Sequence, residues 1–547
     1  MFKRFDKRLL AAFFIFILIL FQGLSNYAIL NKSQYCLDVN GVIYFDFINH
    51  NFKTLKNIRL DFDSILNACN VLFAPDLKPP LFFITASPFL ALGIDKNNVI
   101  MSNLLYFTIL LFATYGIGKK LYDYKTGILA AFLVSVFPSV FALSRVLIID
   151  FALSAMVALT FFLFVLNQFD SFRFSLLTGI VIGLGALSKQ AYFIFFLPIA
   201  AYFFLQKGNL TNKKIMKNFA FLIFVAGAIA AGYYFKVLRS GLPDLYNNLQ
   251  ERTFLNPFFY LEALINRQLL WVFFLLFFAS LIFHLKRGKY FLPLMVIGLL
   301  VIFSLSVNKQ DRFILPIFTY IAVLIAGFVF AFIRYRKLLV WILVLFGVIQ
   351  YLVISFGYLF PADYRFFRNS SVVPGGSIIE SGLFSMVNEG DWENRMEEVI
   401  KIISDNFVQS AHRKKIKILL IAQDPRIIAT LDYLRIVKKM PVKLYNTVID
   451  QAYFMPDKKI NNDFSRQISR CDFLIIEEIL PEYAWNHTKY LYKSFKQNFD
   501  KFILLKIVKF HYSFPGKKDK LYLDNALCKE SAGITNVYVF KNKYLME

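Results

Sequence analysis

The stretch Leu77-Lys78-Pro79-Pro80-Leu81-Phe82-Phe83 places one cation and two prolines directly before an apolar run. Because proline cannot continue a helix and restricts the residue before it, no helix runs through this point and the backbone around Lys78 is fixed. The apolar run that follows is typical of a segment that enters a membrane. A lysine in this position either snorkels to lipid headgroups or binds a phosphate, and both interpretations stay open for Lys78.

The composition around this stretch sets the class of protein. Of the 547 residues, 58% are hydrophobic and 66 are Phe, well above the apolar share of a soluble domain. Apolar runs of near-spanning length recur as far as residue 360, about eleven of them at roughly twenty residues each. They cover 9–29, 99–118, 126–143, 150–168, 174–189, 191–206, 218–238, 269–285, 290–307, 313–333 and 338–360. The sequence therefore predicts a polytopic α-helical membrane protein.

Basic clusters between these runs predict the orientation of the spans. The formal net charge of +25 lies largely in short Lys and Arg clusters, which the positive-inside rule and anionic lipids explain, so no nucleic-acid partner is expected. With an uncleaved first span and the N-terminus inside, every such cluster faces the cytoplasm. The segments that then face outward are 30–98, 144–149, 239–268, 308–312 and everything after residue 360.

A second domain is predicted over 361–547, after a transmembrane domain over 1–360. The apolar composition ends near Pro361, and short strand-like and helix-like segments alternate from there. Ile416–Ala422 is typical of a buried strand, and Asp424-Pro425 indicates the start of a helix over 426–438. Further strands are expected at 471–476, 502–508 and 537–540. A soluble α/β domain follows, and because it lacks a glycine-rich phosphate motif, we expect an accessory or acceptor-binding role.

The four cysteines fall in two pairs on the outward side. Cys36 and Cys69 lie in the first outer loop, and Cys471 and Cys528 lie in the C-terminal region. Each outer compartment thus holds an even number, which favours two disulfides in an oxidising environment. Four unconnected cysteines distributed in this way by chance are the alternative.

Charged residues at the outward ends of the spans are the candidate site residues. Asp38 follows the first span, and Arg145 and Asp150 flank a short apolar link between two spans, where unpaired charge is costly. An ion pair between Arg145 and Asp150 that only neutralises itself is the structural alternative. Lys309 and Arg312 bring two further cations to the same face.

The ordered set of these motifs resembles the GT-C membrane glycosyltransferases. An Asp after the first span, Lys-Pro-Pro-Leu before the second, Arg145 with Asp150, the segment Gly183-Leu184-Gly185-Ala186-Leu187-Ser188-Lys189, and Arg312 ahead of Leu315-Pro316 carry the likeness over roughly residues 1–360. It is greatest to the branch that contains aminoarabinose transferases and protein O-mannosyltransferases, a family 39-like group. Enzymes of this branch take a sugar from a polyprenyl phosphate carrier and transfer it with inversion on the outer face.

The resemblance implies a role for each candidate. Asp38 is the catalytic base for the acceptor hydroxyl or amine. Lys78 and Arg145 bind the carrier phosphate, with added positive potential from Lys309 and Arg312. Asp150 orients Arg145, holds a divalent cation or serves as a buried ion-pair partner, and these alternatives stay open.

The expected function is therefore inverting transfer of a sugar from a polyprenyl phosphate to a lipid, glycan or protein acceptor of the cell envelope. The expected location is the inner, cytoplasmic membrane, with the C-terminal domain outside. Besides the carrier, membrane lipids are the expected partners, and a divalent cation is the one candidate cofactor. A transporter or lipid flippase is the alternative, although such a protein has ionisable residues near the bilayer midplane. A non-catalytic membrane receptor is a third interpretation, which requires Asp38 and Lys78 to be dispensable.

Overall fold

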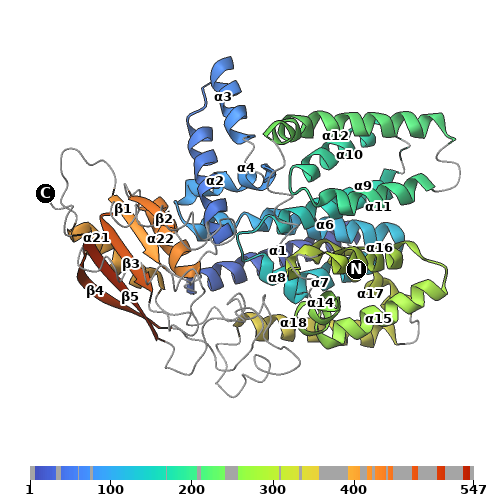
Figure 1. Ribbon diagram of the computed structural model, residues 1–547. Coiled ribbons are helices and arrows are strands. Elements are labelled where there is room, and N and C mark those ends of the chain that lie inside the picture. The colour runs from blue at the N-terminus through green and yellow to red at the C-terminus, as the bar shows by residue number, and fades with distance from the viewer. Residues whose placement is uncertain are drawn as a thin grey trace. The chain divides into compact units, whose positions relative to one another are not determined.

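The computed structural model describes most of the helical region and part of the C-terminal region (Figure 1). The described residues are 7–32, 39–59, 61–73, 78–167, 169, 171–205, 211–240, 257–306, 309–331, 335–356, 392–406, 416–421, 425–438, 442–446, 471–477, 502–511 and 534–542. The chain forms two compact units. The first comprises Met1–Ile29, Phe47–Gly93 and Asn97–Ser385, and the second comprises Leu30–Asp46, Ile94–Lys96 and Met386–Glu547. This division differs from the predicted domains 1–360 and 361–547, because part of the first outer loop joins the second unit.

The described residues up to 356 are almost entirely helical. The helices are α1 (Lys7–Lys32), α2 (Val39–Lys56), α3 (Phe62–Leu72), α4 (Leu81–Ala86), η1 (Ser87–Leu92), α5 (Lys96–Ile100), α6 (Asn103–Leu121), α7 (Tyr124–Val136), α8 (Pro138–Leu143), α9 (Asp150–Asn167), α10 (Phe172–Ala186), α11 (Tyr192–Leu205), α12 (Lys213–Ser240), α14 (Phe259–Ala263), η2 (Leu264–Gln268), α15 (Leu270–Lys286), α16 (Phe291–Leu305), η3 (Asp311–Ile317), α17 (Phe318–Ala331) and α18 (Arg336–Phe356).

Many of these helices are apolar enough to lie in a membrane. Within the described residues, five are long enough to cross it alone, or six if the bent pair Phe259–Asn266 and Leu270–Lys286 forms one span. Six further apolar helices have 10 to 17 residues. Within the described residues, each predicted apolar run is occupied largely by one helix or by two consecutive helices. The prediction of a polytopic α-helical membrane protein is therefore confirmed.

The outer helices expose apolar side chains, as expected for surfaces that face lipid. On α12, Phe224 is 72% exposed, and on α18, Trp341 is 72% exposed. By contrast, the apolar span Asp311–Ala331, which combines η3 and α17, has 83% of an 18-residue stretch buried inside the protein. Since a soluble protein rarely leaves such side chains in water, acyl chains are their natural environment.

Close packing at two glycines fixes α10 against α12. A Cβ at Gly179 would lie 2.7 Å from the carbonyl oxygen of Leu222, and one at Gly183 would lie 2.8 Å from Cβ of Ile229. Only glycine permits this approach, so the end of α10 is held firmly where the chain turns toward Lys189. α9 packs against both α6 and α10. This arrangement brings the start of α9 to the end of α10.

The C-terminal part of the second unit contains a mixed five-stranded sheet (Figure 1). The strands are β1 (Ile416–Ile421), β2 (Val442–Asn446), β3 (Phe473–Glu477), β4 (Phe502–His511) and β5 (Ile534–Asn542), in the order β2-β1-β3-β5-β4. β1 pairs in parallel with β2 and β3, and β5 pairs antiparallel with β3 and β4. The helices α21 (Trp392–Asn406) and α22 (Pro425–Val437) complete its described elements.

The predicted segments of this region agree with the structure to within a few residues. β1 and α22 lie where the strand at 416–422 and the helix at 426–438 were expected, although Asp424 lies outside the described residues. β3, β4 and β5 match the three further strands. β2 was not predicted, because Val442–Asn446 is a short run with two polar side chains.

The two predicted disulfides stay predictions, because each pair includes a cysteine outside the described residues. Cys69 is exposed, and Cys471 is buried. Burial, with a smaller contribution from the charge of Asp472, raises the pKa of the Cys471 thiol to about 12. The other members of the pairs, Cys36 and Cys528, lie outside the described residues.

Candidate active site

The segment around Lys78 is docked on the turn that follows α10. The amide of Leu81 donates a hydrogen bond of 2.9 Å to the carbonyl oxygen of Leu187. Pro79 and Pro80 are buried, and Pro80 is the N-cap residue of α4. As predicted, the prolines separate two helices, since α3 ends at Leu72 and α4 starts at Leu81. Lys78 and Lys189 thereby come from neighbouring segments of the first unit.

Lys78 lines a pocket with a volume of about 300 Å³. Its walls come from α2, from the last turn of α3 and from the start of α4. The lining residues are Phe47, His50, Asn51, Asn70, Val71, Leu72, Lys78, Pro80 and Phe83. Apolar walls with one lysine and several neutral polar side chains suit a ligand that has an anionic head and an apolar body.

The Asp150 carboxylate forms ion pairs with two cations. The side chain of Asp150 is 2% exposed, and Nζ of Lys189 donates to its Oδ1 at 2.5 Å. Nε of Arg312 lies 3.7 Å from Oδ2 of the same carboxylate. The Lys189 ammonium also lies 4.8 Å from the centre of the Phe313 ring. The start of α9, the turn after α10 and η3 therefore meet at one carboxylate.

Cations outnumber anions around Asp150. One carboxylate faces two cations, and the segment that carries Lys78 is bonded through Leu81 to the turn that precedes Lys189. A low-dielectric site with more cations than anions attracts a negatively charged group. Lys189 and Arg312 keep 18% and 20% of their side-chain surface exposed, so both remain partly accessible. The arrangement can bind and stabilise a phosphate.

The segment that carries Lys309 and Arg312 is held in place by polar contacts. Nε of Arg312 donates to Oε1 of Gln310 at 2.7 Å, and Nε2 of Gln268 donates to the carbonyl oxygen of Asp311 at 2.8 Å. Nζ of Lys309 donates to the carbonyl oxygen of Ser306 at 2.7 Å. Arg312 therefore joins the Asp150 cluster, whereas Lys309 contacts the end of α16.

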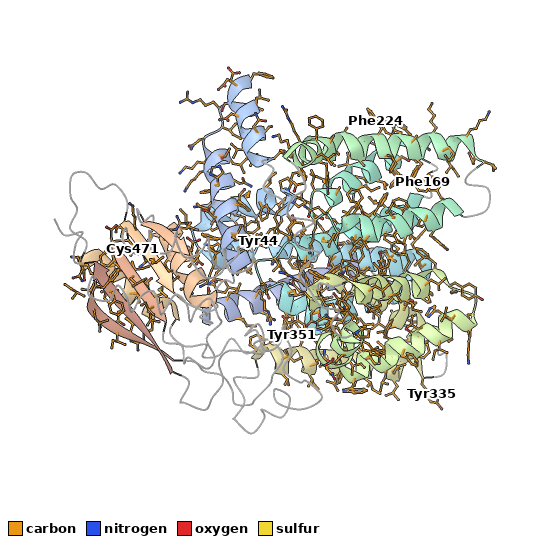
Figure 2. The ribbon with its side chains drawn as sticks, viewed as in Figure 1. Tyr44, Phe169, Phe224, Tyr335, Tyr351 and Cys471 are labelled. Carbon is orange, nitrogen blue, oxygen red and sulfur yellow. The ribbon has the colours of Figure 1, made fainter. Side chains whose placement is uncertain are left out.

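Arg145 lies in a separate, neutral network. Its Nε donates to Asn26 at 3.0 Å, and its Nη2 lies within 3.2 Å of the hydroxyls of Ser25, Tyr351 and Ser355. Tyr351, labelled in Figure 2, belongs to α18, so Arg145 links α1 to α18. The arginine is fully buried, and among the described residues no carboxylate pairs with it. The alternative in which Arg145 pairs with Asp150 is wrong, because Asp150 instead contacts Lys189 and Arg312.

The structure bears differently on the predicted catalytic base and on a possible metal site. Asp38 lies outside the described residues, so its predicted role stays a prediction. Among the residues that the structure describes, no group of three or more His, Cys, Asp or Glu could hold a metal ion. Sequence reasoning named Lys189 only as the last residue of a family-like segment and missed its bond to Asp150. Its position at the end of the segment Gly183–Lys189 was the available signal.

The fold is shared with a solved membrane protein over nearly the whole chain. ArnT from Cupriavidus metallidurans in the apo state is 11% identical, with a TM-score of 0.58 over 97% of this chain and 98% of that chain. The same protein bound to undecaprenyl phosphate gives a TM-score of 0.57 at 11% identity, over 96% and 97% of the two chains. A structure of the Archaeoglobus fulgidus oligosaccharyltransferase gives 0.48 at 13% identity, over 84% and 68%. No curated protein sequence matches the chain.

A family model decides between the transferase and transporter interpretations. Residues 77–234 match the model described as dolichyl-phosphate-mannose-protein mannosyltransferase. This segment begins at the Lys78 motif and contains Asp150 and Lys189. With this match inside that fold, the protein is a multi-pass membrane glycosyltransferase of the GT-C fold. Within that class it resembles the family 39-like branch, as its motifs predict.

Proposed function

We propose that this glycosyltransferase takes a sugar from a polyprenyl phosphate carrier and transfers it, with inversion, to an envelope acceptor on the outer face of the cytoplasmic membrane. The observation that supports this most is the pocket at Lys78, whose segment is hydrogen-bonded to the turn that leads to Lys189 and its partner Asp150. A polyprenyl phosphate has the anionic head and apolar body that such a site suits. One relative in fold, ArnT from Cupriavidus metallidurans, has been solved with undecaprenyl phosphate bound.

In the proposed reaction, an acceptor hydroxyl or amine attacks the anomeric carbon from the side opposite the carrier. The bond between that carbon and the carrier phosphate oxygen breaks, and the polyprenyl phosphate leaves as an anion. Asp38 takes the proton that the acceptor loses. Lys78 and Arg312 stabilise the negative charge that grows on the departing phosphate, with Lys309 adding positive potential. No step requires a metal ion.

Asp150 has a positioning role in this proposal. Its carboxylate holds Lys189 and Arg312 at the site and offsets part of their mutual repulsion. Arg145 is assigned a different role from the phosphate binding that the family pattern implied. Because its guanidinium is enclosed by neutral side chains of α1 and α18, we assign it to holding these helices together.

Titration of the purified protein with polyprenyl phosphate tests the binding part of the proposal. Lys78→Ala should weaken binding by about tenfold to a hundredfold, the expected effect of losing one hydrogen bond to a charged group. Lys78→Arg should restore it only in part, since a planar fork does not replace a compact ammonium. Lys120→Ala removes an exposed cation at the far end of α6 and is the matched control.

A turnover assay with sugar-loaded carrier tests the chemistry. Asp38→Asn should bind carrier nearly as well as wild type but lower turnover by about a hundredfold to ten-thousandfold, since an amide is a very poor base. Wild-type carrier binding by Lys78→Ala, together with no release of polyprenyl phosphate for any envelope acceptor, would overturn the proposal. Mass spectrometry of envelope glycolipids, glycans and proteins with and without the gene then identifies the acceptor.

The proposed orientation has its own test. Reporter fusions after Lys120, Lys214 and Lys337 should be cytoplasmic, and fusions after Asn98 and Gly376 should be external. A cytoplasmic reporter after Gly376 would refute the external C-terminal domain.

A further inference from the structure

Tyr433 on α22 contacts two segments from the early part of the chain. Its hydroxyl donates a hydrogen bond of 2.9 Å to Oδ1 of Asp95 and accepts one of 3.3 Å from the backbone amide of Lys96. Its ring meets the ring of Phe45, on α2, edge to face, with the ring centres 5.2 Å apart. Nζ of Lys96 lies 5.1 Å from the centre of the Tyr433 ring. One side chain therefore joins α2, the turn at Asp95 and α22.

These contacts are shielded from water. Tyr433 is 5% exposed, Lys96 is 4% exposed and Phe45 is fully buried. Burial, together with the charge of Asp95, raises the pKa of Tyr433 above its ordinary value, so the hydroxyl stays protonated and can donate. A hydrogen bond to a carboxylate and a cation over an aromatic ring are both stronger where water is excluded. The contact is therefore strong enough to hold the segments together.

The turn that carries Asp95 and Lys96 has a fixed backbone. Gly93 has a φ of 139°, a conformation that favours glycine, and its carbonyl oxygen accepts a hydrogen bond of 3.1 Å from Nδ2 of Asn98. Lys96 is the first residue of α5 and of the candidate span Lys96–Leu121. The polar partners of Tyr433 thus directly precede a helix of the membrane region.

Phe45 connects this contact to the proposed catalytic base. In the sequence, Asp38 directly precedes Val39, the first residue of α2. The segment Leu30–Asp46 forms one compact unit with the C-terminal elements. Because a helix moves as a stiff rod over two turns, a shift of α2 at Phe45 also shifts the point where the chain enters it. A misplacement of about 1 Å can cost on the order of a hundredfold in rate, so the anchoring of α2 matters for a base at this point.

We propose that Tyr433 is a positioning residue, which clamps the first half of α2 to α22 and so lets the C-terminal domain hold the segment from which Asp38 acts. This role is distinct from the accessory or acceptor-binding role that the sequence predicts for the domain. The part of the proposal that concerns catalysis rests on the proposed function. The clamp itself concerns only the contact between α2 and α22.

Hydrogen exchange of the full-length protein in lipid nanodiscs tests the clamp. Tyr433→Phe keeps the ring but removes the hydroxyl that fixes its position. It should speed exchange of the amides of residues 41–46 by about tenfold, the expected effect of losing one hydrogen bond to a charged group. The matched control is Tyr290→Phe, which removes the hydroxyl of a tyrosine that is 56% exposed and should leave this exchange unchanged. Wild-type exchange over 41–46 in Tyr433→Phe would overturn the clamp.

Kinetics with sugar-loaded carrier test the positioning role. Tyr433→Phe should lower kcat by about tenfold and leave the Kd for polyprenyl phosphate unchanged, because the Lys78 pocket that binds the carrier is intact. A general loss of structure would instead weaken carrier binding and lower kcat together. In an Asp38→Asn background, Tyr433→Phe should have no further effect, since the base that it positions is already lost.

Three results separate this inference from the proposed function. Wild-type kcat in Tyr433→Phe, or a further loss of kcat in the Asp38→Asn background, would refute the positioning role. An equal loss of carrier binding and kcat would reduce Tyr433 to a structural residue and refute it as well. Absence of turnover in wild type with any acceptor would refute the proposed function, while hydrogen exchange over 41–46 still decides the clamp.

Discussion

The substitution Asp150→Asn tests the charge cluster most directly. The carboxylate is 2% exposed and forms ion pairs with both Lys189, at 2.5 Å, and Arg312, at 3.7 Å. The amide keeps the shape of the side chain and one acceptor oxygen, but it leaves two largely buried cations without their counter-charge. Removing one partner of a buried pair costs about 3–5 kcal/mol, so we expect a loss of that size in the free energy of unfolding.

A second variant separates this electrostatic cause from a simple loss of packing. Adding Lys189→Met to Asp150→Asn removes the stranded ammonium and keeps an unbranched apolar chain of similar length. The double variant should recover about 2 kcal/mol or more of the lost stability, because a buried pair and its apolar replacement are often nearly equal in stability. Transferase activity should stay low, since the cations at the phosphate site are no longer positioned.

The assay is equilibrium unfolding of the purified protein in mixed micelles, with carrier binding measured in parallel. Asp63→Asn is the matched control, because it makes the same substitution at an exposed acid of the same unit and should change stability by less than about 1 kcal/mol. If the double variant is no more stable than Asp150→Asn alone, the carboxylate does not act by compensating Lys189, and the reasoning is refuted.

Three further predictions address other parts of the structure. Arg145→Lys should destabilise the protein by about 1–3 kcal/mol in thermal unfolding, because an ammonium cannot reach α1 and α18 at once, and unchanged stability would contradict the linking role. Gly127→Ala should cost about 1–3 kcal/mol, since its Cβ would lie 2.5 Å from the Tyr115 carbonyl oxygen, whereas Gly298→Ala meets nothing within 4 Å and should not. A hydrogen bond from Lys506 lowers the pKa of Glu398, so this group stabilises the fold above its unfolded pKa and loses that effect as pH falls through its lower folded pKa. Hydrogen exchange of β4 should therefore depend less on acid pH in Lys506→Met than in wild type, and identical pH profiles would contradict this role.

Local sequence patterns were sufficient to predict the helical architecture and most strands of the sheet. Apolar runs of spanning length in this chain are helices, because a backbone in lipid must satisfy its own hydrogen bonds. The two prolines after Lys78 ended one helix before the next, as expected from their missing amide and fixed φ. The helix after Asp424-Pro425 and the strand before it followed from the same kind of local signal.

The tertiary structure decided which charged groups meet. Lys189 lies 39 residues from Asp150, and their contact depends on the packing of α9 against α10. Arg145 is only five positions from Asp150, yet it faces Ser25, Asn26, Tyr351 and Ser355 instead. Closeness in the sequence therefore suggested a pair between Arg145 and Asp150, which the structure does not form.

The sequence by itself determined that this protein is a polytopic membrane protein, and that Lys78 starts a new segment. Composition and periodicity predict these features, because a helix that faces lipid must have apolar side chains over its whole spanning length. Only the tertiary structure determined that Asp150 joins Lys189 to Arg312, and that Arg145 is instead held by side chains of α1 and α18. Such contacts depend on which helix ends come together, and that is set by side-chain packing between segments distant in the chain.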